Sequence, residues 1–376
     1  MTTVAVICEY DPFHRGHQLQ LDLIRKTFGA DTTIISLMSG DVVQRGRLAL
    51  YAKHTRAEAA LACGSDLVLE LPAPYACASA EAFARGAVEI LNGLGGIDIL
   101  CFGSETGDLA SLTKAAEVIA SPAYLTALRE APEEESHMRN AEAVFRSLVG
   151  DGFPTLPNDI LGVEYLSALS TCQAAITPFT YRREADYSAS EARRILTAGG
   201  EASSLLPEDA MAIFSKVPLT QTAAYDAVAL YTLRSTPPSI LETYYAMNGG
   251  VAGLLKHRAE EATSVEELIA LCTSRKFSAA RLRRGILAAV LSYTTEQIYA
   301  PPRFTRLLGA NNRGRCYLSA IRKTATLPIV TKPADGLSLE GEAGRQFETS
   351  LRADQLMALV RHEPPVLCFR RGAVLV

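Results

Sequence analysis

The sequence lacks features that define several classes of protein. Its eight cysteines contain no CxxC pair, so they predict neither a zinc ribbon nor a disulfide framework, and we interpret them as buried thiols. No uninterrupted apolar stretch approaches the roughly 18 residues that span a bilayer. The first apolar run, residues 4–8, has no basic residue before it and is followed by Glu9, which predicts a strand and not a signal peptide. We therefore expect a cytoplasmic protein with no membrane partner and no metal site.

The composition is typical of a globular chain. Tryptophan is absent, but hydrophobic residues make up 48% of the chain and charged residues 21%, which excludes a disordered or collagen-like protein. Neither an internal repeat nor a low-complexity tract is present. The length of 376 residues exceeds one average domain, so two domains are expected.

Short apolar runs alternate with segments of helical periodicity in the first half. The runs lie at residues 4–8, 33–38, 66–71 and 97–102, and helical patterns lie at 18–28, 52–62 and 80–91. A fifth strand is expected at 175–181, after a helix at 158–169. Such a series predicts an α/β fold with a doubly wound parallel sheet, which binds ligands at the carboxyl ends of its strands. A glycine-containing linker at 197–204 then leads to mostly helical patterns, so we expect a sheet domain over residues 1–200 and a mainly α-helical domain over 201–376.

Charge is distributed unevenly along the chain. The net charge of −4 gives no reason to expect a nucleic acid partner, but the segment 275–323 holds eleven basic residues and one acid, Glu296. Acidic partners at i+4, typical of a solvated helix, are missing from this segment. A clustered basic segment indicates binding to a phosphate backbone, here RNA. The candidate contacts are Arg275, Lys276, Arg281, Arg283, Arg284, Arg303, Arg306, Arg313, Arg315 and Lys323.

The most specific local motif, EYDPFHRGH at residues 9–17, directly follows the first strand. On the first turn of a helix, His14 and His17 point to one side, beside free backbone N–H groups and the positive end of the helix dipole. Gly16 lets a nucleotide approach the backbone, and a helix N-terminus after a parallel strand binds phosphate. The pair can stabilise the charge that develops when an α-phosphate is attacked. Metal ligation by the two histidines is an alternative, although no third ligand is near them in the sequence.

The tetrapeptide His14-Arg15-Gly16-His17 resembles the HxGH motif of the nucleotidyltransferase superfamily, which has a HUP-like sheet domain. A longer ordered series resembles the bacterial tRNA(Met) cytidine acetate ligase family over nearly the whole chain. It comprises residues 9–17, MSGDVVQRG (38–46), KHTRA (53–57), DLVLELP (66–72), FGSE (102–105), PNDIL (157–161), SASEAR (188–193) and RFTRLLG (303–309) with Gly314-Arg315. The resemblance implies an ATP-dependent ligase that activates acetate as acetyl-adenylate and acetylates the wobble cytidine of elongator tRNA(Met) to N4-acetylcytidine, with Mg²⁺ accompanying ATP. The alternative is a small-molecule adenylyltransferase of the same fold without an RNA substrate.

The resemblance also implies an ATP site, with His14 and His17 as its catalytic residues. Its members are Ile7, Cys8, Glu9, Tyr10, Asp11, Pro12, Phe13, His14, Arg15, Gly16, His17, Gln18, Leu19, Gln20, Gly103, Asn158, either Arg182 or Arg183, and the phosphate-binding Ser188, Ser190 and Arg193. We expect Gly103 to leave room for the adenine ring and Asn158 to bond a base or ribose. The alternatives are a turn glycine, a plain helix N-cap at Asn158, and a capping pattern at Ser188 to Glu191.

Two residues depart from the family pattern. Relatives commonly have asparagine where this chain has Asp11 and Arg15, and the carboxylate of Asp11 would repel a triphosphate unless it points away or binds Mg²⁺. We expect Arg15 to offset that charge. The loop after the second strand supplies polar groups suited to an acetate or cytidine pocket, and we predict for it Ser39, Asp41, Gln44, Arg45 and Lys53, the last of which could equally lie on a solvated helix face.

Overall fold

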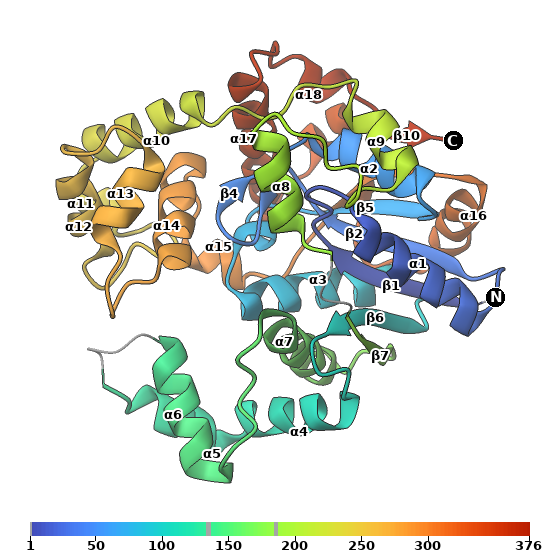
Figure 1. Ribbon diagram of the computed structural model, residues 1–376, viewed down its shortest axis with the longest axis horizontal. Coiled ribbons are helices and arrows are strands. Elements are labelled where there is room, and N and C mark those ends of the chain that lie inside the picture. The colour runs from blue at the N-terminus through green and yellow to red at the C-terminus, as the bar shows by residue number, and fades with distance from the viewer. Residues whose placement is uncertain (1, 133–136, 184–186) are drawn as a thin grey trace.

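A mostly parallel β-sheet occupies the centre of the computed structural model, which describes residues 2–132, 137–183 and 187–376 (Figure 1). In this part of the chain the sheet has eight strands in the order β10-β8-β5-β2-β1-β6-β7, with β9 paired to β8. They are β1 (Thr3–Cys8), β2 (Thr33–Ser39), β5 (Leu67–Leu71), β6 (Ile99–Ser104), β7 (Thr177–Arg182), β8 (Thr305–Ala310), β9 (Ile329–Val330) and β10 (Val374–Leu375). The short β3 (Val42–Val43) and β4 (Arg47–Leu48) form a separate antiparallel hairpin.

All five strands predicted for the first half are confirmed. β1 pairs in parallel with β2 and β6, β2 pairs with β5, and β6 pairs with β7. The chain therefore builds the sheet first to one side of β1 and then to the other, which is the predicted doubly wound arrangement. Successive side chains face opposite sides, since Ala5 and Leu37 belong to one buried cluster while Val4, Val6 and Met38 belong to the other. Both faces are covered, which explains the continuous apolar runs.

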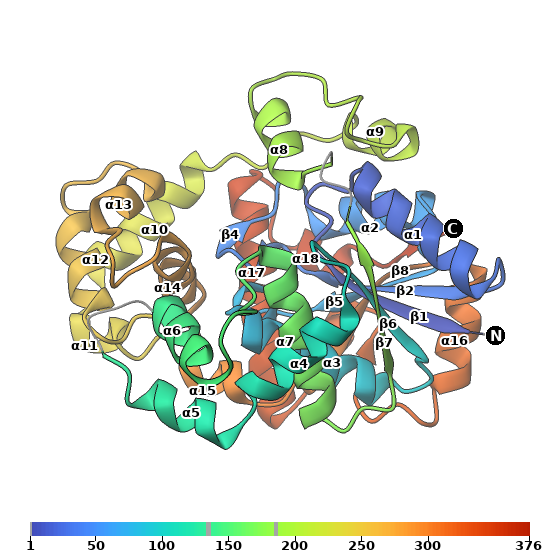
Figure 2. The same cartoon turned by 60° about the horizontal axis from the view of Figure 1, so that its bottom comes forward.

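Helices cover the two faces of the sheet (Figure 2). α1, α2, α8 and α9 pack on one face, and α3, α4 and α7 pack on the other. The helices are α1 (Arg15–Phe28), α2 (Lys53–Ala62), α3 (Ala80–Leu94), α4 (Leu109–Ile119), α5 (Pro122–Arg129), α6 (His137–Val149), α7 (Pro157–Thr171), α8 (Ala189–Thr197), α9 (Glu208–Phe214), α10 (Ala223–Ser235), α11 (Pro238–Leu241), α12 (Val251–Ala259), α13 (Val265–Cys272), α14 (Ala279–Leu291), α15 (Thr295–Tyr299), α16 (Asn312–Ile321), α17 (Gly341–Val360) and α18 (Leu367–Arg370), with short 3₁₀ turns η1 (Tyr75–Cys77) and η2 (Pro333–Ser338). Within the described ranges, none is both long and apolar enough to cross a membrane.

The second half of the chain is helical only in part. Helices α10 to α15 form a group beside the sheet, as Figure 1 shows. The chain then returns, because β8 pairs antiparallel with β5, and β9 and β10 pair with β8. The expectation that the sheet ends near residue 200 is therefore wrong. The run TRLLGA of β8 contains Arg306, whose charge suggested surface, yet ion pairs to distant residues allow that side chain to be buried.

Candidate active site

Two histidines lie at the start of α1, directly after β1. His14 is the N-cap residue, and its Nδ1 accepts a hydrogen bond from Gly16 N at 3.0 Å. His17 Nδ1 accepts one from His14 N at 3.2 Å. Their rings are stacked, with centroids 3.8 Å apart. Because both Nδ1 atoms are acceptors, each neutral imidazole carries its proton on Nε2 and has one N–H donor left for a ligand.

The backbone N–H groups of this helix turn already have acceptors. Arg15 N donates to Leu205 O at 2.8 Å, Gly16 N donates to His14 Nδ1, and His17 N donates to His14 O at 2.9 Å. The expectation that these groups are free for phosphate is therefore wrong. At this helix end the donors available to an anion are the imidazole Nε2–H groups.

Both imidazoles are neutral in the folded protein. Burial, assisted by the positive charges of Arg183 and Arg193, lowers the pKa of His14 from 6.5 to about 3. Burial, His14 and Arg183 lower the pKa of His17 well below its ordinary value. A neutral imidazole among cations donates a hydrogen bond without adding to their mutual repulsion, so the pair suits a site whose positive charge comes from arginine.

We expect the imidazole resonances of His14 to keep their neutral-form shifts from pH 8 to pH 5 in a nuclear magnetic resonance titration. Its folded pKa lies below the unfolded value, so the unfolded chain takes up a proton that the folded chain refuses, and this group lowers stability as pH falls below about 6.5. Loss of the assigned signal in a His14→Asn variant identifies it. A titration midpoint near 6.5 would contradict the described environment.

Asp11 points into the protein and away from solvent. Its Oδ1 accepts a hydrogen bond from Leu50 N at 2.6 Å, and its Oδ2 pairs with Arg47 at 2.6 Å. Burial raises the pKa of Asp11, but the neighbouring guanidinium groups, Arg47 first, outweigh it and hold that pKa below its ordinary value. Arg15 does not offset this charge as expected, because its guanidinium donates to Ser204 O at 3.1 Å. Arg47 takes that role, and sequence analysis missed it.

Gly103 lies in β6 directly against Arg183. A Cβ at this position would lie 2.6 Å from Arg183 Cγ and 3.0 Å from Tyr181 Cζ, so glycine is what allows Arg183 to cross the strand end. Arg183 acts electrostatically on both histidines, whereas the neighbouring Arg182 is exposed and its backbone packs against Gly107. Of the two arginines, the structure therefore brings Arg183 to the HxGH motif. Room for an adenine ring over Gly103 stays a prediction.

Asn158 belongs to a reciprocal clamp between β6 and α7. Glu105 accepts hydrogen bonds from Asn158 Nδ2 at 2.6 Å and from Asp159 N at 2.9 Å. Asp159 in turn accepts one from Glu105 N at 3.0 Å. The N-cap residue of α7 is Leu156, so the alternative of Asn158 as a plain N-cap is wrong. The Asn158 amide is thereby fixed at the carboxyl end of β6 with its side-chain oxygen unused by this clamp.

The start of α8 lies against the start of α1. A Cβ on Gly16 would lie 3.2 Å from Tyr187 Cβ, just ahead of α8. Ser188 is the N-cap residue of α8 but makes no side-chain capping hydrogen bond, so capping does not explain it. Ser190 Oγ accepts a hydrogen bond from Arg193 at 2.9 Å, and Arg193 also donates to the carbonyl oxygen of residue 11 at 2.5 Å. Serine and arginine side chains of α8 are thus brought to the histidine motif.

The hairpin of β3 and β4 joins this motif to helix α14. Gln44 N donates to Glu9 Oε1 at 2.7 Å, and Arg47 pairs with Asp11. On the other side of the hairpin, Gly46 has a φ of +74° and lies against the backbone of Arg284. The hairpin therefore sets the position of α14 relative to the histidines.

We expect Gly46→Ala to lower the free energy of unfolding by about 1–3 kcal/mol more than Gly95→Ala. Both glycines have a similar positive φ, +74° and +72°, which an L side chain rarely adopts, so both variants carry backbone strain. A Cβ at Gly46 would lie 2.6 Å from Arg284 N, whereas nothing lies within 4 Å of one at Gly95. Urea denaturation measures the difference. Equal losses in the two variants would show that the hairpin does not press on α14.

Arg56 is a supporting residue whose role the sequence did not reveal. It is fully buried and donates to Tyr51 O at 2.9 Å, to Glu9 O at 2.5 Å and to Gly40 O. Glu9 follows β1 and Gly40 follows β2, so this single guanidinium joins two strand-end loops. Its place in the KHTRA run was compatible with an exposed helix face, and only the fold shows that the helix turns it inward.

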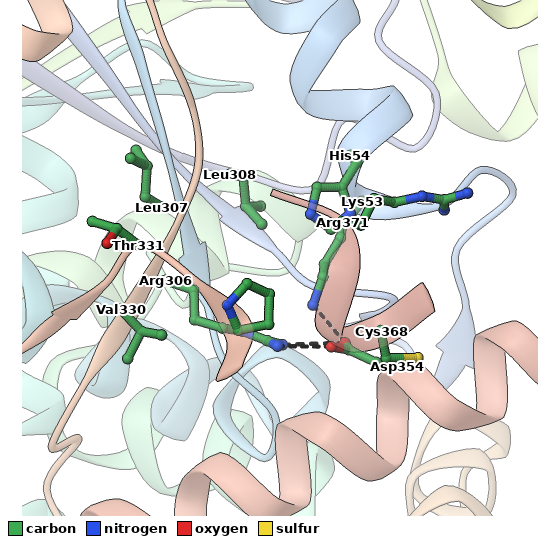
Figure 3. Close-up of a pocket in the computed structure, with 11 residues that line it drawn as sticks. Lys53, His54, Arg306, Leu307, Leu308, Val330, Thr331, Asp354, Cys368 and Arg371 are labelled. Atoms are coloured by element: carbon green, nitrogen blue, oxygen red, sulfur yellow. Dashed lines mark hydrogen bonds and ion pairs between the residues drawn. The ribbon is translucent and has the colours of Figure 1, made fainter. Parts of the chain in front are cut away.

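Lys53 and Arg306 form a buried ion network with two carboxylates, Glu70 and Asp354, and Figure 3 shows the bonds to Asp354. Lys53 Nζ lies 3.1 Å from Glu70 Oε2 and also pairs with Asp354, and Arg306 contacts Glu70 at 2.8 Å and Asp354 at 2.7 Å. All four side chains are at most 6% exposed. The expectations that Lys53 serves a substrate pocket and that Arg306 contacts RNA are therefore wrong, because both side chains are buried and form ion pairs with Glu70 and Asp354. The network fastens α2, β5, β8 and α17 together.

The other residues predicted for a substrate pocket have different surroundings. Asp41 accepts a hydrogen bond from Lys53 N at 2.7 Å, and burial raises its pKa from 3.8 to about 6. Ser39 is buried, and its Oγ has no partner in the described part of the chain. Arg45 is exposed at the tip of the hairpin. Asp41, Ser39 and Arg45 thus have different surroundings, and their part in a substrate pocket stays a prediction.

The basic segment 275–323 does not form one surface. Arg275 to Arg284 belong to the helical group, whereas Arg315 lies on α16, at the far side of the molecule in Figure 1. Arg313 on α16 donates to Ala30 O, next to the amino end of β2, while the histidines lie at the carboxyl ends. The sum of charges over residues 275–323 thus combined arginines that the fold places on different sides of the molecule.

The family model for the HIGH Nucleotidyl Transferase matches residues 1–366, and the chain belongs to this family. Two curated relatives are named tRNA(Met) cytidine acetate ligase. One from Acetivibrio thermocellus is 30% identical and covers 97% of this chain and 96% of its own, and one from Syntrophotalea carbinolica is 36% identical over 88% and 85%. The resemblance predicted from the ordered motifs is confirmed.

Solved structures agree with this assignment. The crystal structure of Thermotoga maritima TmcAL bound with alpha-thio ATP has a TM-score of 0.91 to this chain, with 26% sequence identity over 100% of both chains. The apo crystal structure of the same protein matches equally well. The whole chain, including the returning strands β8 to β10, therefore has the architecture of a solved nucleotide-binding relative.

Proposed function

We propose that this protein is an ATP-dependent carbon–nitrogen ligase. It activates acetate as acetyl-adenylate and transfers the acetyl group to the wobble cytidine of elongator tRNA(Met), giving N4-acetylcytidine. The observation that carries the proposal is the pair of neutral histidines at the carboxyl end of β1, in a chain similar over nearly its full length to proteins named for this reaction. The related structure with alpha-thio ATP supports ATP as the nucleotide. These substrates place the activity in the cytoplasm.

Different side chains are proposed to act in the two steps of the reaction. An acetate oxygen attacks the α-phosphorus of ATP and pyrophosphate leaves, while the Nε2–H donors of His14 and His17 stabilise the charge that develops on the phosphate oxygens. Arg183 and Arg193 supply positive charge beside them. The N4 amine of cytidine then attacks the acetyl carbon, AMP leaves, and the amine loses a proton. Asn158, whose side-chain oxygen the Glu105 clamp does not use, is proposed to bond the nucleoside.

Mg²⁺ is proposed to enter as the ATP complex and not as a resident ion. Over the described residues, no group of three His, Cys, Asp or Glu side chains is placed to hold a metal. Both carboxylate oxygens of Asp11 are engaged, by Leu50 N and by Arg47. The positive charge that this chain itself offers the triphosphate is that of its arginines.

Exchange of labelled pyrophosphate into ATP tests the first step. We expect exchange that depends on added acetate and proceeds without RNA. ATP binding without exchange in the presence of acetate would overturn the proposed adenylate. Exchange with acetate but no transfer to any tRNA would favour the small-molecule adenylyltransferase instead.

A further inference from the structure

Buried aromatic rings enclose the imidazole of His17. The Tyr10 ring meets that imidazole edge to face with the ring centroids 4.8 Å apart, and the Phe13 ring lies 5.4 Å from it. His14 stacks on the same imidazole. Tyr10 and Phe13 are both fully buried. Because side chains in a close-packed interior fix one another, the direction of the His17 Nε2–H donor depends on where these rings lie.

The Tyr10 hydroxyl is anchored in the sheet by a chain of serine hydroxyls. Tyr10 Oη lies 3.0 Å from Ser36 Oγ, and Ser36 Oγ lies 2.9 Å from Ser65 Oγ. Ser65 Oγ donates its proton to Leu67 O at 3.3 Å. Because a hydroxyl has one proton to donate, Ser65 accepts from Ser36, and Ser36 accepts from Tyr10. The phenol is therefore the first donor of a directed chain that runs from the end of β1 through β2 to β5.

Ser36 is a polar residue inside a buried strand. It lies in the middle of β2, which is buried along its whole length, between Ile35 and Leu37. A hydroxyl in such a place costs free energy unless it is hydrogen-bonded. Its partner Tyr10 has a φ of +47°, a left-handed conformation that residues other than glycine rarely adopt and that is typical of functional sites. A buried serine and a strained tyrosine are thus joined by one hydrogen bond beside His17.

We infer that Ser36 is a positioning residue for adenylation, which acts through Tyr10 to hold the imidazole of His17 in place. The inference rests on the proposed function. Ser36 and Tyr10 are both fully buried, so they act on ATP through the histidine. Without the serine hydroxyl the phenol loses its acceptor, and Cys8 Sγ, which also lies at the phenol, is a weak acceptor that replaces it only in part. The Tyr10 ring then shifts, and the packing of His17 shifts with it.

Acetate-dependent pyrophosphate exchange tests this role. We expect Ser36→Ala to lower kcat by about 10-fold, as a small misplacement of a catalytic group does, while KM for ATP stays within about 2-fold. Adding Tyr10→Phe should recover most of the lost rate, because removing both partners together leaves neither oxygen unpaired. Tyr317→Phe is the matched control. It deletes a buried phenol that donates to Gly95 O at 2.6 Å, in the loop ahead of β6, and its kcat should not change.

The imidazole resonances of His17 separate this inference from the proposed function. Ser36→Ala should change these resonances, which are identified by their loss in His17→Ala, and the double variant should return them toward those of the unaltered protein. Normal kcat in Ser36→Ala, a low kcat that Tyr10→Phe does not restore, or an equal fall in Tyr317→Phe would overturn the role of Ser36 while leaving the ligase proposal intact. If the unaltered protein shows no acetate-dependent exchange, the ligase proposal falls. Unchanged His17 resonances in Ser36→Ala would then overturn the positioning role as well.

Discussion

His17→Ala is expected to lower the rate of acetate-dependent pyrophosphate exchange by roughly 10²- to 10³-fold, the usual cost of removing one donor to a developing oxyanion. The variant loses the Nε2–H group that the hydrogen bond from His14 N to His17 Nδ1 fixes in place. It also removes the stacking partner of the His14 ring. Binding of tRNA should persist, because the neutral imidazole of His17 contributes no positive charge that would attract a phosphate backbone.

His54→Ala is the matched control for this experiment. His54 lies on α2 and lines a small pocket with Lys53, Arg306 and Asp354 (Figure 3), and no residue of the HxGH motif lines that pocket. We expect its exchange rate to stay within a few-fold of that of the unaltered protein. Exchange by His17→Ala at half the normal rate or more, in protein with an unchanged thermal midpoint, would show that this imidazole does not take part in adenylation.

Asp354→Asn is expected to lower the free energy of unfolding by about 3–5 kcal/mol at pH 7. The change leaves the buried cations Lys53 and Arg306 facing Glu70 with one carboxylate fewer. It also releases α17 from β8, because Arg306 bonds Asp354 through two nitrogens, at 2.7 Å and 3.1 Å. Urea denaturation at equilibrium measures the decrease.

The pH dependence of this effect has a definite sign. Burial raises the pKa of Asp354, but Arg306 and Lys53 outweigh it and hold that pKa at about 2, below its ordinary 3.8. The stabilising contribution is therefore complete above pH 3.8 and is lost as the pH falls through about 2. Glu348→Gln, on the exposed side of the same helix, should change stability by less than about 0.5 kcal/mol. A decrease of less than about 1 kcal/mol in Asp354→Asn would contradict the network.

The strands of the first half were predictable because burial on both faces demands continuous apolar runs. β8 was not, since its burial depends on Arg306 meeting Glu70 and Asp354, and partners so distant in the chain leave no local pattern. The same reason explains Lys53, whose position on α2 fitted an exposed face until β5 and α17 supplied its carboxylates. Local periodicity therefore identified the strands of the first half, while long-range ion pairs determined where Lys53 and Arg306 lie.

The candidate site was also predictable only in part. The spacing of His14 and His17 indicated their common orientation, because a helix turn fixes it. Their capping bonds, which occupy both Nδ1 atoms, depend on the exact path of the backbone, which spacing does not specify. The partners of Asp11 and the role of Gly46 could not be predicted from the sequence either, since both depend on how the hairpin of β3 and β4 packs against elements far away in the chain.

Nucleoside mass spectrometry of elongator tRNA(Met), after incubation with the protein, ATP and isotope-labelled acetate, tests the central claim most directly. We predict labelled N4-acetylcytidine at the wobble position, formed together with AMP and absent when ATP or acetate is omitted. Unmodified cytidine in tRNA that the protein demonstrably binds, with no AMP released, would contradict the account.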